Sequence, residues 1–101
     1  MGEVISPQLV KVLTEVTGEM HLDSALRILA RDAIDHRLKQ LDARLLALEH
    51  QYGCSFESFD RRFQAGEIPN QHAYAIEQDY LEWEGLLSRQ RHLLKVRMWL
   101  Q

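Results

Sequence analysis

The sequence predicts an all-α protein, built as a long antiparallel helical hairpin with a short bridging helix and a small N-terminal helix. Three observations favour this fold class. The chain is rich in Leu, Ala, Glu, Gln and Arg, which are strong helix formers. Only two prolines and five glycines interrupt its 101 residues. Apolar residues recur at three- and four-residue steps over two long stretches, as they do along one face of a helix.

Composition and charge are those of an ordinary globular protein, and the length predicts a single domain, residues 1–101. Hydrophobic residues make up 46% and charged residues 27%. A net charge of −3 provides no overall basic field to attract nucleic acid. The single cysteine, Cys54, cannot form an internal disulfide, and no membrane-length apolar run or signal peptide is present. We therefore expect a cytoplasmic protein that does not enter a membrane.

Residues 1–22 are expected to form an arm with one short helix. Glu3-Val4-Ile5 has the composition of a very short strand. Ser6 followed by Pro7 is typical of a helix N-cap with proline at the first helical position, and Gly18 is a candidate C-cap. This order of elements also fits a reduced ribbon-helix-helix, a DNA-binding fold. Because the strand carries an acid and no base-reading donor, DNA binding stays an open question.

Residues 23–52 are predicted to form the first long helix. Asp23 or Ser24 is a candidate N-cap, and Gly53 is a candidate end. A helix of about 29 residues would be about 44 Å long. From Ile34 onward the apolar residues follow a heptad pattern, which is typical of helices that pair along a narrow seam. The two seam positions are occupied by Ile34, Leu41 and Leu48, and by Leu38, Leu45 and Tyr52.

Residues 55–65 are predicted to form a short helix, with Ser55 as N-cap and Gly66 at its end. One face of this helix carries all three phenylalanines of the chain, Phe56, Phe59 and Phe63.

Residues 71–100 are predicted to form the second long helix, with Asn70 as a candidate cap. Its apolar residues occupy a seam and a second row: Ile76, Tyr80, Trp83, Leu87 and Leu94, then Leu86, Leu93 and Leu100. One neighbouring helix cannot cover so wide an apolar arc. We therefore expect a homodimer.

Charge is divided along this last helix. Five acids and no base lie between Glu67 and Glu84, and four bases and no acid follow Gly85. Complementarity to the helix dipole accounts for this division. In an antiparallel hairpin, however, Asp42 and Glu49 would lie on the same flank as Glu84 and Glu77 of the last helix. Solvent, Arg61-Arg62 or a basic partner would have to neutralise this acidic flank.

We therefore predict a partner-binding surface on the last helix, where an aromatic ridge of Tyr74, Tyr80 and Trp83 accompanies the acids. The same aromatic side chains also fit an ordinary core. The predicted contact residues are Glu77, Asp79, Tyr80, Glu82, Trp83 and Glu84.

Catalytic motifs are lacking: the chain has no Gly-rich phosphate loop, paired-cysteine motif or HExxH. The most enzyme-like feature is Asp79 with Glu82, at the i, i+3 spacing with which all-helical nucleotide pyrophosphatases hold magnesium. The second pair at this spacing, Asp32 with Asp35, lies in the wrong part of the other long helix. We therefore expect no enzyme activity, no cofactor and no metal. A magnesium-dependent pyrophosphatase and a purely structural coiled-coil dimer are the alternatives.

Three stretches resemble antitoxin-like proteins of type II toxin–antitoxin pairs, a group of small prokaryotic proteins. They are LLALEHQYGCSFESF at 45–59, RFQAGEI at 62–68 and DYLEWE at 79–84. The resemblance covers residues 40–85, and the N-terminal third is similar only in layout. It implies a non-enzymatic, cytoplasmic, dimeric protein that holds a small basic toxin through its C-terminal helices. The basic, DNA-reading N-terminus usual in antitoxins is not evident in this chain.

Overall fold

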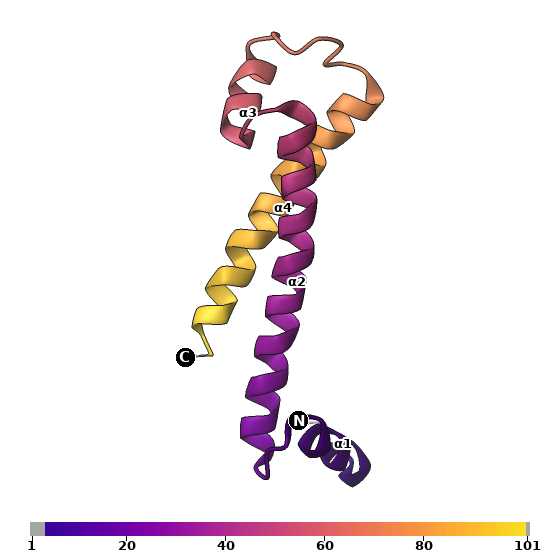
Figure 1. Cartoon of the computed structure of the whole chain (residues 1–101), viewed down its shortest axis with the longest axis vertical. Helices are drawn as coiled ribbons and strands as arrows, with labels where there is room; N and C mark the ends of the chain where they lie inside the picture. Colours follow the sequence, from indigo (N-terminus) through magenta and orange to yellow (C-terminus); the bar gives the residue numbers. More distant parts are fainter. Residues whose placement is uncertain (1–3, 101) are drawn as a thin grey trace.

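The computed structural model describes residues 4–100, and over that range all regular secondary structure is helical. The helices are α1 (Pro7–Thr17), α2 (Leu22–Tyr52), α3 (Phe56–Gln64) and α4 (Tyr74–Met98). α4 returns along α2, α1 packs at the foot of α2, and α3 lies at the opposite end of α2, where it contacts α4 (Figure 1). The predicted all-α class, hairpin and two short helices are thus confirmed.

The molecule is a rod measuring 58 × 27 × 21 Å. Its radius of gyration is 19.7 Å, whereas a compact domain of this length has about 13 Å. We call residues 42–90, which include α3 and the turns packed around it, the head. Residues 4–41 and 91–100 are called the stalk. The two regions differ in how well they bury their apolar side chains.

Local capping signals correctly predict several helix ends. Ser6 and Ser55 cap α1 and α3, and each hydroxyl oxygen accepts a 3.2 Å hydrogen bond from a backbone N–H three residues on. Gly18 and Gly53 end α1 and α2 with φ angles of 73° and 69°. A residue with a Cβ would be strained in this left-handed conformation, which explains glycine at both places.

The predicted cap of α2 is wrong by two or three residues. His21, not Asp23 or Ser24, occupies the N-cap position, and no side chain caps the helix there. Asp23 lies in the first turn, where it pairs with Arg27 at 2.9 Å. An acid in this turn still complements the helix dipole.

The predicted start of α4 is also wrong. The helix begins at Tyr74 rather than at Gln71, and Asn70 lies in the preceding loop with a φ of 56°. The buried Gln71 side chain holds this loop: its amide oxygen accepts from the Ile68 N–H at 3.1 Å, and its amide nitrogen donates to the Phe63 carbonyl at 2.9 Å. Because Gln71 is used to fix the loop, the helix starts only after it.

The short strand expected at Glu3-Val4-Ile5 is not seen in its described part. Val4 and Ile5 have no regular secondary structure, and Glu3 lies outside the described residues. Residues 4–100 therefore do not show the strand-first order of a ribbon-helix-helix.

The main core lies in the head. Leu45 and Leu48 of α2, Phe59 of α3, Ile68 of the loop and Trp83 of α4 form one buried cluster. The Phe59 ring lies 5.3 Å from the Trp83 ring, measured between centroids.

Tyr80 and Phe63 stack at the edge of this cluster, with ring centroids 4.4 Å apart. Tyr74 is instead 79% exposed. The aromatic ridge of the last helix is therefore divided, because Tyr80 and Trp83 belong to the core and Tyr74 does not.

Candidate functional site

The six predicted contact residues on α4 fall into two groups. Trp83 is 1% exposed, and Asp79, Tyr80 and Glu82 contact side chains of α2 or α3. Glu77 and Glu84 are exposed. The structure thus shows four of the six residues in contact with other helices of the chain, and the partner-binding role of all six stays a prediction.

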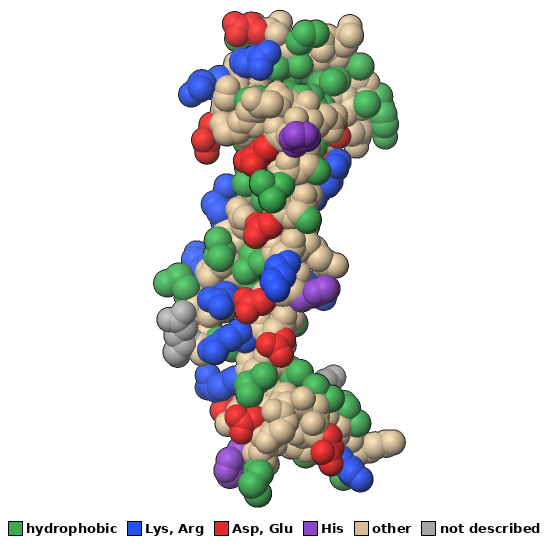
Figure 2. Space-filling view, in the orientation of Figure 1, with side chains coloured by type: hydrophobic (Ala, Val, Ile, Leu, Met, Phe, Trp, Pro, Cys, Tyr) green, Lys and Arg blue, Asp and Glu red, His purple; other side chains and the backbone are tan. Residues whose placement is uncertain are grey.

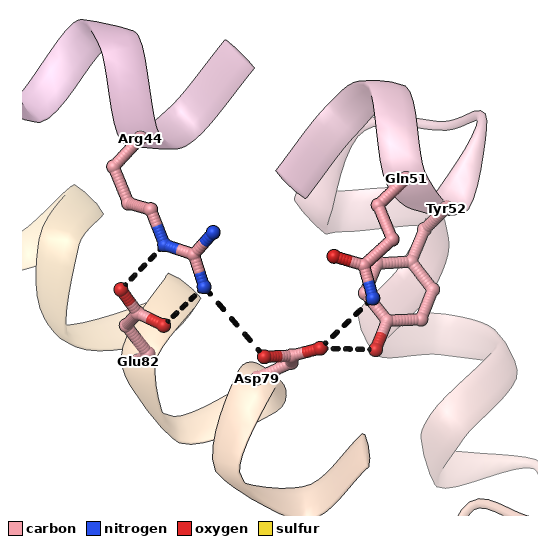
Figure 3. A network of polar contacts seen from close by, with 5 residues as sticks. All are labelled: Arg44, Gln51, Tyr52, Asp79 and Glu82. Carbon is pink, nitrogen blue, oxygen red and sulfur yellow. Dashed lines mark hydrogen bonds and ion pairs between the residues drawn. The ribbon is translucent and has the colours of Figure 1, made fainter. Parts of the chain in front are cut away.

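Arg44 of α2 neutralises one flank of the hairpin. Its guanidinium donates two hydrogen bonds, each 2.7 Å long, to the carboxylate of Glu82, and it lies 3.8 Å from Asp79 (Figure 3). Such a bidentate pair favours the charged form of both partners. Accordingly, Arg44 holds the pKa of Glu82 below its usual value, and Glu82 raises the pKa of Arg44.

Asp79 is held from the other side by α2. Its second carboxylate oxygen accepts from the Tyr52 hydroxyl at 2.6 Å and from the Gln51 amide at 3.1 Å (Figure 3). Burial, followed by this hydrogen bond, raises the pKa of Tyr52 to about 12. Both oxygens of Asp79 therefore face donors or a cation of α2.

A second tyrosine–aspartate pair joins α3 to α4. The Tyr80 hydroxyl donates to the carboxylate of Asp60, and the Gln64 amide donates to the Tyr80 oxygen at 3.2 Å. The Asp60 hydrogen bond, and then burial, raise the pKa of Tyr80. The two pairs link all three helices of the head through polar contacts at the edge of the apolar core.

The four carboxylates considered for magnesium do not converge. Asp35 accepts a 2.7 Å hydrogen bond from Arg97, and Asp79 contacts α2 at Gln51. Asp35 and Gln51, the α2 residues at these two contacts, lie about 24 Å apart along the helix, at 1.5 Å per residue. Within residues 4–100 the structure contains no group of three or more His, Cys, Asp or Glu side chains that could hold a metal ion.

The opposite flank of the hairpin is arranged differently from our expectation. Asp42 accepts a 2.8 Å hydrogen bond from the Gln90 amide of α4. Asp42 and Glu49 line a groove that α3 helps to enclose, whereas Glu77 and Glu84 do not line it. The predicted contact of acid against acid is therefore replaced by an open groove.

This groove has a volume of about 440 Å³ and an apolar floor formed by all three helices of the head. Three of its lining residues are acids, Asp42, Glu49 and Glu57, and none is Lys, Arg or His. Leu46 of α2 stands at its edge with 64% of its surface exposed. The lining residues are Asp42, Leu45, Leu46, Glu49, Ser55, Phe56, Glu57, Trp83, Leu87 and Gln90.

The stalk also exposes apolar side chains. No residue of α1 is buried, and Leu9, Val12 and Val16, at helical spacing on one face, are 48%, 50% and 68% exposed. At the other end of the chain, Met98 and Trp99 are about as exposed. Hydrophobic side chains accordingly reach the surface at the foot of the rod, where α1 lies, and near the C-terminus, partway along it (Figure 1 and Figure 2).

Comparison with protein-family models, curated proteins and solved structures finds no match for this chain. No described helix is long and apolar enough to cross a membrane.

Proposed function

We propose that this chain is a non-enzymatic, cytoplasmic protein-binding module of the antitoxin type. It forms a homodimer and neutralises a small basic toxin through its C-terminal helices. The support comes from the large amount of surface that the rod leaves open, together with the sequence resemblance described above.

The observation that carries the proposal is the accessible surface of 7635 Å². A compact monomer of 11.8 kDa exposes about 5,900 Å². The excess is about 1,700 Å², and one partner in an interface of standard size loses about 800 Å². The chain thus has room for two interfaces, one with a second copy and one with another protein.

The apolar stripe of α1 is our candidate for the dimer contact. Leu9, Val12 and Val16 face away from α2 at helical spacing, and Met20 beyond them is 90% exposed. A continuous exposed apolar face of this kind is typical of an interface. The acids of the groove in the head, Asp42, Glu49 and Glu57, are then left for a basic partner.

The toxin-binding proposal is tested by co-expression with the products of the neighbouring genes. We expect a small basic protein to co-purify in a fixed ratio, and its toxicity to growth to disappear when this chain is present. If no neighbouring product binds, or if the chain releases pyrophosphate from nucleotides in the presence of magnesium, the antitoxin proposal is wrong.

The dimer is tested by light scattering on the purified chain. We expect a mass of about 24 kDa, twice that of one chain, because the stripe of each copy covers that of the other. Val12→Asp with Val16→Asp should halve the mass. Gln8→Asp with Lys11→Gln changes the net charge equally on the exposed polar side of α1 and should preserve the dimer. A monomeric wild type would rule out this part.

A further inference from the structure

We infer that the groove of the head binds one basic amphipathic helix of the partner protein. This inference rests on the proposed function and deepens it, because it names the docking residues on this chain and the chemistry of the segment that they accept. The residues that carry it are Asp42, Leu46 and Glu49 of α2, with Glu57 of α3.

The acids of the groove lack the neutralisation that the other flank receives. On that flank, Arg44 pairs with both Asp79 and Glu82. In the groove, the side-chain hydrogen bond that Asp42 accepts within residues 4–100 comes from a neutral amide, that of Gln90. No basic side chain within residues 4–100 forms an ion pair with Glu49 or Glu57. Like charges left together in this way favour a basic ligand.

The spacing of these residues matches a helix. Asp42 and Glu49 lie two turns apart on α2, about 10 Å at 1.5 Å per residue, with Leu46 between them. A partner helix lying along α2 would place bases at positions i and i+7 opposite the two acids. An apolar residue at i+3 or i+4 would then face Leu46.

The apolar surface of the groove provides the contact that such a helix needs. Phe56 and Leu87 are the partly exposed apolar residues of its floor, Trp83 lies almost fully buried beneath them, and Leu46 stands at its edge. On its outer side Leu46 is flanked by Ala43 and Ala47, which line a second, shallower hollow. Small side chains beside an exposed leucine allow another helix to approach closely, as helices in a groove do.

The outer face of α4 has a similar order of acidic and apolar residues but lies outside the groove. Glu77, Leu81 and Glu84 follow one another at helical spacing, and Leu81 is 57% exposed. His72 lies 3.3 Å from Glu77. None of these four residues lines the groove, so Leu81 provides a matched comparison for Leu46.

The experiment selects peptides on the full chain. A displayed library of random 18-residue helical peptides is panned against the wild type, and selected peptides are titrated by fluorescence anisotropy. We expect Lys or Arg at i and i+7 with a large apolar residue midway. Leu46→Arg and Glu49→Lys should each weaken binding at least tenfold, and Leu81→Arg should leave it within twofold. Added salt should weaken binding to the wild type.

Several outcomes would overturn the inference: selection of acidic or patternless peptides, no enrichment over beads without the chain, or loss on Leu81→Arg instead of Leu46→Arg. A change of mass in Leu46→Arg by light scattering would show that a second copy occupies the groove. Both Leu46 and Glu49 are exposed, and circular dichroism checks that their variants stay folded. Glu57→Lys, on α3, is a third groove variant, and it should also weaken peptide binding.

Failure of the inference and failure of the proposed function can be told apart. If a natural toxin binds Leu46→Arg and Glu49→Lys as tightly as the wild type, the antitoxin proposal stands and the groove is not its docking site. If peptides with the expected pattern bind the groove but no neighbouring gene product does, the groove stands and the antitoxin proposal falls.

Discussion

The head and the stalk are built from the same two long helices, yet they bury side chains to very different degrees. In the head, α3 closes over α2 and α4, and five apolar residues form one buried cluster. In the stalk, the buried apolar residues are Ala25, Ile34 and Leu93. Two helices side by side can cover only one stripe of each other, whereas a third element encloses a core.

This difference implies that the head is stable within one chain and that the stalk depends more on a second surface. The packed cluster of aromatic rings, the buried Gln71 and the two tyrosine–aspartate pairs are all in the head. The exposed apolar stripe of α1 is in the stalk. Three measurements test this difference between the head and the stalk.

Truncating the two tryptophans should give the largest contrast. Trp83→Ala in the head should lower the free energy of unfolding by about 3–5 kcal/mol, because it opens a cavity in a closed core. Trp99→Ala in the stalk, where the ring is 68% exposed, should change it by less than about 0.5 kcal/mol. Urea denaturation followed by circular dichroism measures both. Equal losses would show that the stalk is as well packed as the head.

The second measurement tests how the Tyr52–Asp79 hydrogen bond of the head affects stability at high pH. Folding raises the pKa of Tyr52 from 10 to about 12, so the folded chain holds this proton more tightly than the unfolded chain. The resulting stabilisation is complete below pH 10 and is lost as the pH rises toward 12.

We expect the free energy of unfolding to fall more steeply between pH 10 and 12 for the wild type than for Tyr52→Phe. Urea titrations at a series of pH values measure these slopes. Tyr74→Phe, at an exposed position of the same α2–α4 hairpin, is the control and should retain the wild-type slope. Identical slopes for Tyr52→Phe and the wild type would contradict the prediction.

The smallest contrast compares two surface ion pairs. Arg44→Ala in the head should lower the free energy of unfolding more than Arg27→Ala in the stalk, because a bidentate pair and a contact with a second carboxylate are lost together. Arg27→Ala in the stalk removes one i, i+4 pair with Asp23 and should cost about 0.3 kcal/mol. A double-mutant cycle with Glu82→Ala isolates the pair energy. A larger loss for Arg27→Ala would reverse the comparison.

Much of the fold is predictable because helix ends depend on local chemistry. Ser6, Gly18, Gly53 and Ser55 act through their own backbone or through residues three positions away. Asn70 shows where this reasoning fails. Its side chain suits a cap, but the neighbouring Gln71 is bound by Ile68 and Phe63 from the loop and α3. Such contacts depend on how the chain folds back on itself.

The candidate site is less predictable for the same reason. The acids of α4 are visible in the sequence, but whether they are free depends on Arg44, 38 residues away from Glu82. One signal could have revealed this pair: Arg44 lies beside the heptad seam of α2, on the flank opposite Asp42 and Glu49. Applying the flank comparison to both sides of the seam would have placed Arg44 against the acids of α4.

The helices, the heptad seam, most of the helix caps and the concentration of phenylalanine in the short helix follow from the amino-acid sequence alone, because these features depend on neighbours within one or two turns. The packing of the helices against one another determined which acids are paired and which line an open groove. It also decided that Trp83 is core and that the face of α1 is bare. The position of α3 against one side of the hairpin is the physical reason, since it closes the head and leaves the stalk uncovered.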